Sequence, residues 1–229
     1  MKNAQRSSLT NIHRVLQSRR VVVVAAVIIV AGCTGSYDAQ YEEAISLGHF
    51  LEAKTLAKQQ LAAYALRDYN PTLPLRMAEA HYRHAYAHGK LGEYDSMKIS
   101  LDSGVNLDPT FFNKKQRMLE YFEVEEYNKG VSAYNAGDFE GSLVRLRTAS
   151  SIVDGQIPHE KCTALILRVM ASASIAAGKQ EDALDYYEKA SAMGDPLASE
   201  KLASAQNGES PEPEPTLKTR PGVTLSGIP

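Results

Sequence analysis

The apolar positions of the chain follow two patterns. Near the N-terminus the ten residues Val21–Val30 form an uninterrupted apolar run, with Arg19 and Arg20 directly before it. Further along, stretches of helical character alternate with short turns of small residues. A membrane-spanning helix needs roughly 20 apolar residues, so the first run is too short for a simple transmembrane anchor. The short apolar run and the arginines before it favour an export signal that is not part of the fold.

The residues around this run resemble a bacterial lipoprotein signal. The motif Val30-Ala31-Gly32-Cys33 closes the run, and the leader before it is basic, with no acidic residue before Asp38. The resemblance implies that residues 1–32 are a signal peptide, removed by cleavage after Gly32, and that Cys33 carries the lipid. A second resemblance, of Ser18-Arg19-Arg20 to the start of a twin-arginine export signal, leaves the export route open.

The lipoprotein resemblance also implies a location. Thr34 follows Cys33, where the family's inner-membrane retention signal would place Asp. In a cell with two membranes the chain would therefore be anchored in the outer membrane and face the periplasm. The expected location is the bacterial cell envelope.

The charge of the mature part argues against nucleic acid as a partner. The whole chain has 25 Lys and Arg and 27 Asp and Glu. The leader carries five of the basic residues and none of the acidic ones, which leaves 20 against 27, or a net charge of −7. Phosphate binding requires a basic patch with interleaved aromatic residues, and the mature sequence contains none.

The helical stretches form a repeat. Four turns contain a glycine, at Gly48, Gly92, Gly137 and Gly178, with spacings of 44, 45 and 41 residues (92−48, 137−92, 178−137). Each glycine can adopt the left-handed conformation that ends a helix and lets the chain reverse into an antiparallel partner. The sequence therefore predicts about four helical hairpins.

These hairpins resemble the tetratricopeptide repeat, a helical hairpin of about 34 residues. The second copy, Ala78 to Pro109, fits the repeat in register. Its matching positions are His81, His84, Ala85, His88, Met97, Leu101, Gly104 and Asp108-Pro109. The other copies keep Tyr41, Phe50, Ala53 and Ala57, then Gly130, Leu146 and Ala149, then Leu167, Met170, Ala171, Ala183, Tyr187 and Ala190. The third copy departs at Glu126 and Lys129, which stand at positions that are usually apolar.

The expected fold is an all-α solenoid of about four such hairpins in residues 33–206. The small residues Ala85, Gly130 and Ala171 would let helices approach closely, and the stretch Leu197–Ala205 would be a terminal helix that caps the last hairpin. From residue 207 to 229 the composition changes, since five of the ten prolines lie in the final 19 residues, with glutamates among them. This composition predicts a disordered tail.

Two kinds of side chain suggest binding chemistry. His81, His84 and His88 lie on one helix face and would suit zinc or copper, but they also occupy helix-packing positions and have no obvious fourth ligand beside them. A metal- or small-ligand-binding envelope lipoprotein is thus one hypothesis, and histidines packed in the hairpin are the alternative. Cys162 is the only cysteine left once Cys33 is acylated, and it is expected to be a small buried hydrophobe or a reactive thiol.

The tyrosines suggest the other hypothesis. In the family that the repeats resemble, the inner face of the first helices binds peptides. The matching positions here are Glu79, Tyr82, Tyr86, Lys90, Tyr127, Val131, Tyr134, Asn135, Arg168 and Ser172. Tyrosine suits a recognition surface because it combines apolar area with a hydroxyl group. The alternative is that these rings pack against the neighbouring repeat, and the sequence favours neither interpretation over the other.

Known catalytic motifs are absent: the sequence contains no phosphate-binding Gly-rich motif, no G-x-S-x-G and no H-E-x-x-H. We therefore expect neither an enzyme nor a cofactor. The expected function is a lipid-anchored interaction scaffold for protein or peptide partners in an envelope assembly, of the kind that builds outer-membrane proteins, pili or secretion systems. The partner and the oligomeric state cannot be derived from the sequence.

Overall fold

The computed structural model describes residues 34–153 and 160–225, except for the side chains of residues 34–36 and 160–162. The predicted signal peptide, its lipidation residue Cys33 and the side chain of Cys162 lie outside the described residues. The chain divides into two compact units, the first ending at Asp108 and the second beginning at Pro109. Each unit is described by itself below.

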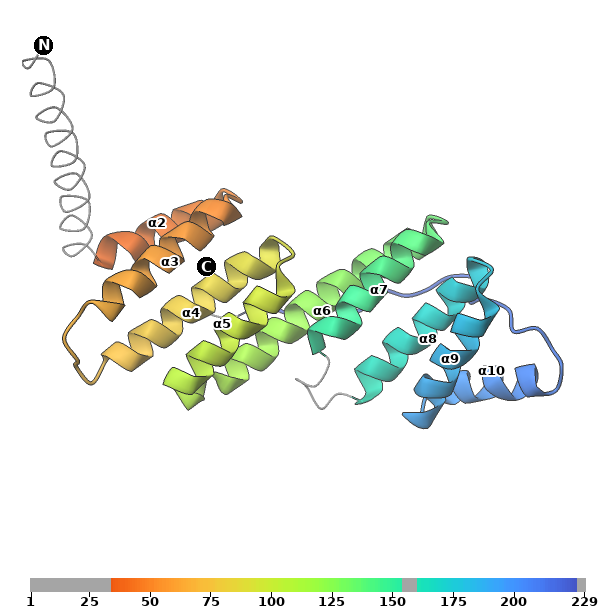
Figure 1. Ribbon diagram of the computed structural model, residues 1–229. Coiled ribbons are helices and arrows are strands. Elements are labelled where there is room, and N and C mark those ends of the chain that lie inside the picture. Colours follow the sequence, from red (N-terminus) through yellow and green to blue (C-terminus); the bar gives the residue numbers. More distant parts are fainter. Residues whose placement is uncertain (1–33, 154–159, 226–229) are drawn as a thin grey trace, which may run out of the picture. The chain divides into compact units, whose positions relative to one another are not determined.

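The first unit consists of two helical hairpins (Figure 1). Its helices are α2 (Thr34–Ser46), α3 (Phe50–Ala65), α4 (Leu73–Lys90) and α5 (Tyr94–Leu107). Within this unit α3 packs against both α2 and α4, so the two hairpins share one continuous interior. Buried residues in it include Tyr41, Ala53 and Ala87.

The second unit contains two further hairpins and a last helix. Its elements are the 3₁₀ turn η1 (Pro109–Phe111), then α6 (Phe112–Asn135), α7 (Phe139–Val153), α8 (Glu160–Ala176), α9 (Gln180–Ala192) and α10 (Pro196–Gln206). Here α7 packs against α6 and α8, and α10 packs against α9, as the predicted capping helix should. The 24 residues of α6 help to explain why the glycine spacings exceed the length of one repeat.

The predicted all-α class is confirmed, since the residues with described backbone contain helices and no strand. The helices pack in adjacent pairs, as expected for stacked hairpins. In the described part of the chain, no helix has both the length and the apolar character required to cross a membrane.

The glycine turns form as predicted. Gly48, Gly92, Gly137 and Gly178 all have positive φ, between 74° and 84°. At the first turn the amide of His49 donates to the carbonyl of Ala44 at 2.8 Å, and the amide of Gly48 donates to Ile45 at 3.0 Å. These bonds satisfy carbonyls that the end of α2 would otherwise leave without partners.

Small residues allow close helix packing in both units. Ala85 and Ala171 are fully buried. A Cβ atom added at Gly130 in α6 would come within 2.9 Å of Cγ of Leu146 in α7, closer than packed side chains approach. A side chain at this position would therefore fit in the third hairpin only if the buried Leu146 shifted.

The charged residues that depart from the repeat pattern lie beside each other in the third hairpin. Glu126 is buried, and its carboxylate accepts hydrogen bonds from Nζ of Lys129 at 2.8 Å and from Arg145 of α7 at 3.0 Å. A buried carboxylate is tolerated when it is paired in this way. An ion-paired group thus lies at a position where the resemblance to the repeat led us to expect an apolar one.

The C-terminal segment has an extended conformation in the structure. Residues 209–225 have neither helix nor strand, but they contact α6 and α8, and Leu217 is only 5% exposed. The disorder expected of residues 207–229 from their composition stays a prediction. Pro fixes φ and keeps the residue before it extended. The four prolines between residues 211 and 221 favour an extended segment that loses little entropy on binding to a surface.

Candidate functional site

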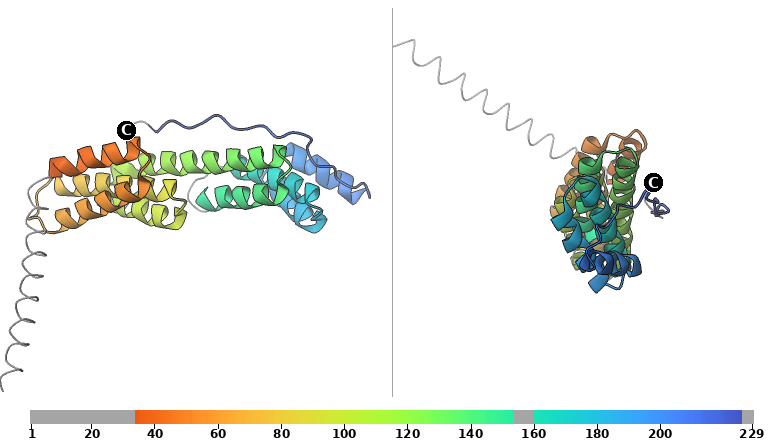
Figure 2. Two further views of the ribbon diagram at one scale, coloured as in Figure 1. Left: turned by 90° about the horizontal axis from the view of Figure 1, so that it is seen from above. Right: turned by 90° about the vertical axis from the view of Figure 1, so that its right-hand side faces the viewer.

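The extended C-terminal segment crosses the face formed by the first helices of the two hairpins in the second unit. Figure 2 shows it, in dark blue, running alongside the green helix α6 in the view from above. It contacts α6 at residues between Glu123 and Asn135, and α8 at Arg168. This face, made by α6 and α8 and occupied by residues 211–223, is called the inner face below.

Two asparagines of α6 hold the main chain of the segment. The side-chain amide of Asn135 donates to the carbonyl of Leu217 at 3.0 Å and accepts from the amide of the same residue at 3.0 Å. Asn128 does the same for Arg220, at 2.9 Å and 2.7 Å. Each asparagine thus forms a two-point pair with one peptide residue and satisfies both of its backbone groups.

The spacing of the two asparagines matches the spacing of the two residues they hold. They are seven positions apart (135−128), or about 10.5 Å along a helix. Leu217 and Arg220 are three positions apart (220−217), or about 9.3 Å in a polyproline II segment. Because the lower helix number pairs with the higher segment number, the segment runs antiparallel to α6.

Two tyrosine hydroxyls add contacts to the main chain. Oη of Tyr127 donates to the carbonyl of Lys218 at 3.2 Å, and Oη of Tyr134 donates to the carbonyl of Glu214. Burial raises the pKa of both hydroxyls, and the nearby Glu214 carboxylate raises that of Tyr134 further. Both groups are therefore protonated and act as donors at neutral pH.

Three side chains of the segment have specific partners. Glu214 forms an ion pair with Arg168 of α8, which also contacts Asp195 at 3.2 Å. Leu217 lies in the buried cluster that contains Tyr127, Val131, Tyr134 and Ile166. Arg220 forms an ion pair with the buried Glu123, and its guanidinium carbon lies 5.6 Å from the centre of the Tyr127 ring.

Burial along the segment repeats every three residues. Pro211, Glu214, Leu217, Arg220 and Val223 are buried or half-buried, and every residue between them is exposed. A repeat of three is the period of polyproline II. The segment therefore presents one edge to the inner face and leaves its other side chains in solvent.

The inner face carries charges opposite to those of the segment at both ends of the segment. Burial acts to lower the pKa of Arg168, but the carboxylates of Glu214 and Asp195 outweigh it and raise that pKa. A basic group on α8 thus faces the acidic end of the segment, and the acidic Glu123 on α6 faces its basic end. This arrangement fixes the direction in which an extended chain can lie.

Most of the sequence-predicted groove residues of the second unit meet at this face. Tyr127, Tyr134, Asn135 and Arg168 bond to the segment directly. Val131 is fully buried in the cluster that includes Leu217. Ser172 is also fully buried, with Oγ 3.5 Å from Oη of Tyr187, so it belongs to the interior of the fourth hairpin.

The groove candidates of the first unit all lie on α4. Tyr82 is buried at 8% exposure, and Tyr86 packs half-buried against the cluster of Tyr41 and Ala53. Nζ of Lys90 lies 5.7 Å from the centre of the Tyr86 ring, and Glu79 is half-buried. In this unit the packing role that the sequence left open for the tyrosines accounts for Tyr86.

Two of the three histidines of α4 have polar partners within their own unit. Nδ1 of His84 lies 3.1 Å from Oγ of Ser100 in α5, and Nδ1 of His88 contacts the carboxylate of Glu93. Nδ1 of His81 is buried without a hydrogen-bond partner. Within the described residues, no group of three His, Cys, Asp or Glu side chains is placed to hold a metal ion.

His84 predicts a pH dependence of stability. Burial, together with His88, His81, Lys54 and Lys58, lowers its pKa from 6.5 to about 4. As the pH falls from 6.5 towards 4 the unfolded chain takes up a proton that the folded chain excludes, so stability is lost over this window and is fully present above it. We expect a loss on the order of 1–2 kcal/mol, reduced from the full linkage because the ring keeps some contact with water.

Urea unfolding followed by circular dichroism between pH 7 and pH 4 checks this expectation. His84→Gln should flatten the pH dependence, whereas His49→Gln, at an exposed histidine, should leave it as in the wild type. Equal slopes for wild type and His84→Gln would show that His84 is not the titrating group.

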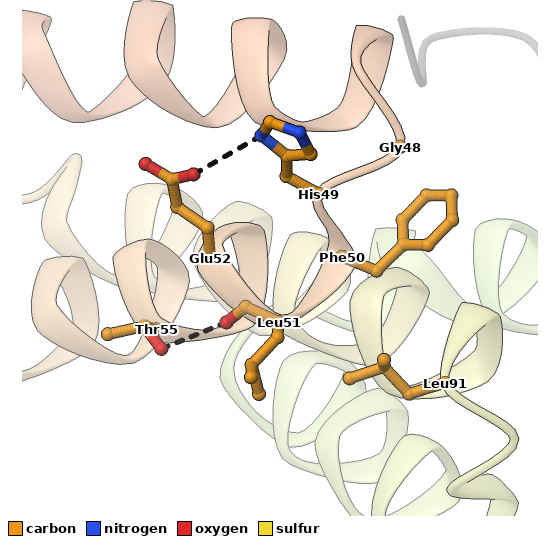
Figure 3. A pocket seen from close by; sticks show the side chains of 7 residues that line it. All are labelled: Gly48, His49, Phe50, Leu51, Glu52, Thr55 and Leu91. Atoms are coloured by element: carbon orange, nitrogen blue, oxygen red, sulfur yellow. Dashed lines mark hydrogen bonds and ion pairs between the residues drawn. The ribbon is translucent and has the colours of Figure 1, made fainter.

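An open pocket of about 530 Å³ lies at the turns of the first unit, lined by Gly48, His49, Phe50, Leu51, Glu52, Thr55 and Leu91 (Figure 3). Its polar groups make local contacts: Nδ1 of His49 lies 3.5 Å from Glu52, and the Thr55 hydroxyl donates to the Leu51 carbonyl of its own helix. These polar groups do not converge on a common point, so the pocket suggests no chemistry.

The sequence-based reasoning missed Glu123 and Asn128 on α6 and the whole partner set Glu214, Leu217 and Arg220. Two signals were available in the sequence. Asn128 and Asn135 share a helix face with Tyr127, Val131 and Tyr134, and the three segment residues recur at a spacing of three. Both spacings are compatible with an extended chain beside a helix, but neither identifies that chain without the structure.

Comparisons with known proteins add little. No protein-family model matches the chain, and no curated protein sequence matches it. Among solved structures, the crystal structure of BtubC (BKLC) from P. vanneervenii is similar over 97% of this chain and 100% of its own, with 15% sequence identity and a TM-score of 0.32. That score is too low to support an argument about fold or function.

Proposed function

We propose that this chain is a lipid-anchored envelope protein that binds extended polypeptide segments of partner proteins on the inner face of its second unit. The single observation that supports this most is the convergence of Tyr127, Tyr134, Asn135 and Arg168 on one extended segment. These residues were expected at a peptide-binding groove from the repeat resemblance.

The chemistry of the face suits a polypeptide ligand. The asparagine pairs and the tyrosine hydroxyls bond to backbone carbonyls and amides, which every polypeptide has. Backbone contacts of this kind give affinity for an extended chain, and pockets for alternate side chains give specificity. A scaffold without catalysis needs nothing more than such a face and an anchor.

The anchor is the second part of the proposal. It rests on the lipoprotein-like motif at Val30-Ala31-Gly32-Cys33 and on the basic leader before it. A lipid on Cys33 would hold the helical units at a membrane surface and raise the local concentration of envelope partners. The resemblance of the hairpins to tetratricopeptide repeats supports the role as an adaptor in an envelope assembly.

Photo-crosslinking in intact cells tests both parts. A photoreactive residue at Ser132, exposed on α6 beside Asn128 and Asn135, should capture envelope proteins in the membrane fraction without removing a contact to the bound chain. The matched position is Val144 of α7, which is helical and 60% exposed, and it should capture few of them. Cys33→Ser in the same background should leave the protein at precursor size, without its lipid.

Two results would contradict the proposal. Equal capture from residues 132 and 144 would show that the inner face is not the binding face. A Cys33→Ser protein that is processed like the wild type and stays with the membranes would show that Cys33 does not carry the anchor.

A further inference from the structure

The extended segment on the inner face belongs to the same chain, so the site is already occupied. The segment follows α10 through residues 207–210, which are all exposed. Its bonds to α6 and α8 come from side chains of those helices, and none of them is part of a helix's own backbone ladder. The segment can therefore leave the face without breaking a helix.

The occupied site defines what it recognises. One position must be acidic to pair with Arg168, the third residue after it must be apolar to enter the buried cluster, and the sixth must be basic to pair with Glu123. The residues between them are exposed and carry no requirement beyond an extended backbone. The pattern is acidic-x-x-Leu-x-x-Arg.

Proline is compatible with this pattern only at certain places. Leu217 and Arg220 must donate their amides to Asn135 and Asn128, and proline lacks that amide. The prolines of the segment stand at 211, 213, 215 and 221, so none of them occupies a donating position. They extend the chain without removing a hydrogen bond that the face requires.

We propose that the inner face is a receptor for an extended segment of a partner polypeptide with the pattern acidic-x-x-Leu-x-x-Arg, and that residues 211–223 are a built-in competitor which a partner displaces. This inference rests on the proposed function and specifies the partner of the same face. Charge complementarity at both ends and the fixed register select a polypeptide segment that resembles the competitor.

Tethering determines the size of the effect. A segment joined to the face by a short linker has an effective concentration in the millimolar range, so it competes strongly with a free peptide of the same sequence. Releasing the segment should therefore strengthen the binding of a free peptide by about tenfold or more. The wild-type chain should bind the same peptide weakly.

The experiment uses the full mature chain and a fluorescein-labelled peptide with the sequence of residues 209–225, followed by fluorescence anisotropy. Leu217→Asp releases the segment by placing a charge in the buried cluster, and Arg220→Glu is a second release variant that leaves the apolar contact intact. Thr216→Asp is the matched control, because it adds the same charge at an exposed neighbour. Circular dichroism confirms that each variant is folded.

We expect Leu217→Asp and Arg220→Glu to bind the peptide at least about tenfold more tightly than wild type and Thr216→Asp. Adding Asn128→Ala and Asn135→Ala to Leu217→Asp should abolish the gain, and a scrambled peptide should not bind. Equal binding by wild type and both release variants would overturn the inference. A wild-type dimer that Leu217→Asp converts to a monomer would overturn it too, by assigning the face to the segment of a second copy.

The two proposals fail in different ways. If the peptide does not distinguish the release variants while residue 132 still captures envelope proteins, the recognition pattern is wrong and the scaffold function stands. If the peptide binds as expected but residue 132 captures nothing in cells, the face binds such segments in solution and the scaffold function is wrong.

Discussion

Replacing Tyr187 with alanine should destabilise the second unit by about 3–5 kcal/mol, the usual cost of removing a large buried aromatic side chain. Tyr187 of α9 is fully buried, in a cluster with Leu167, Ala171, Ala183, Ala190 and Ala198. Four of these neighbours are alanines, whose short side chains cannot move in to fill the space. The cavity would therefore remain largely open.

Tyr187→Phe is the matched control. The Tyr187 hydroxyl lies 3.5 Å from Oγ of Ser172, at the limit of a hydrogen bond, so its removal should cost less than about 1 kcal/mol. Urea unfolding followed by far-ultraviolet circular dichroism measures both variants. A loss below about 1 kcal/mol for Tyr187→Ala would mean that the ring does not fill the interior of the fourth hairpin.

The equivalent change in the first unit, Tyr41→Ala, should also cost about 3–5 kcal/mol. Tyr41 of α2 is fully buried, and its hydroxyl donates to the carbonyl of Arg83 in α4 at 2.8 Å. The Arg83 guanidinium carbon lies 5.7 Å from the centre of the ring. Removing the side chain would thus lose an apolar contact, a hydrogen bond and a cation–π contact between α2 and α4.

Two controls separate these contributions. Tyr41→Phe keeps the ring and loses only the hydroxyl, which should cost about 1 kcal/mol. Tyr69→Ala removes a tyrosine that is 80% exposed and should change stability by less than about 0.5 kcal/mol. The same urea titration serves for all three, and a Tyr41→Ala protein as stable as Tyr69→Ala would show that the Tyr41 ring does not fill the interior of the first unit.

Local sequence signals were sufficient for the helical framework. A glycine needs no distant partner to end a helix, so Gly48, Gly92, Gly137 and Gly178 marked the hairpin turns correctly. Buried small residues such as Ala171 and large ones such as Tyr187 also fell where the repeat pattern placed them. These features depend on residues that are close together in the sequence, within one turn or one hairpin, so they can be recognised from the sequence alone.

The occupant of the inner face could not be found in the same way. Its bonds join residues far apart in the chain: Tyr127 and Lys218 are 91 positions apart, and Asn128 and Arg220 are 92 apart. Composition contains no information on the order of residues, so prolines and glutamates together predict disorder. A proline-rich chain is, however, also preorganised to bind in an extended conformation. The three-residue period of buried positions along the segment can be recognised only when the segment is seen beside α6.

The two tyrosines of α6 combine the roles that the sequence left open. Tyr127 and Tyr134 bond to the main chain of the C-terminal segment, and both rings are also packed in the unit's interior. A tyrosine has an apolar ring and a polar end, so one residue can serve both roles. The two alternatives that the sequence left open are therefore not exclusive at this face.

Amide hydrogen exchange of the mature protein, resolved by residue with nuclear magnetic resonance, tests the central claim that the inner face holds an extended segment. The amides of Leu217 and Arg220 donate to Asn135 and Asn128, so they should exchange about tenfold or more slowly than those of the exposed neighbours Thr216 and Thr219. Asn128→Ala with Asn135→Ala should remove this difference. Equally fast exchange at all four amides of the wild type would contradict the account.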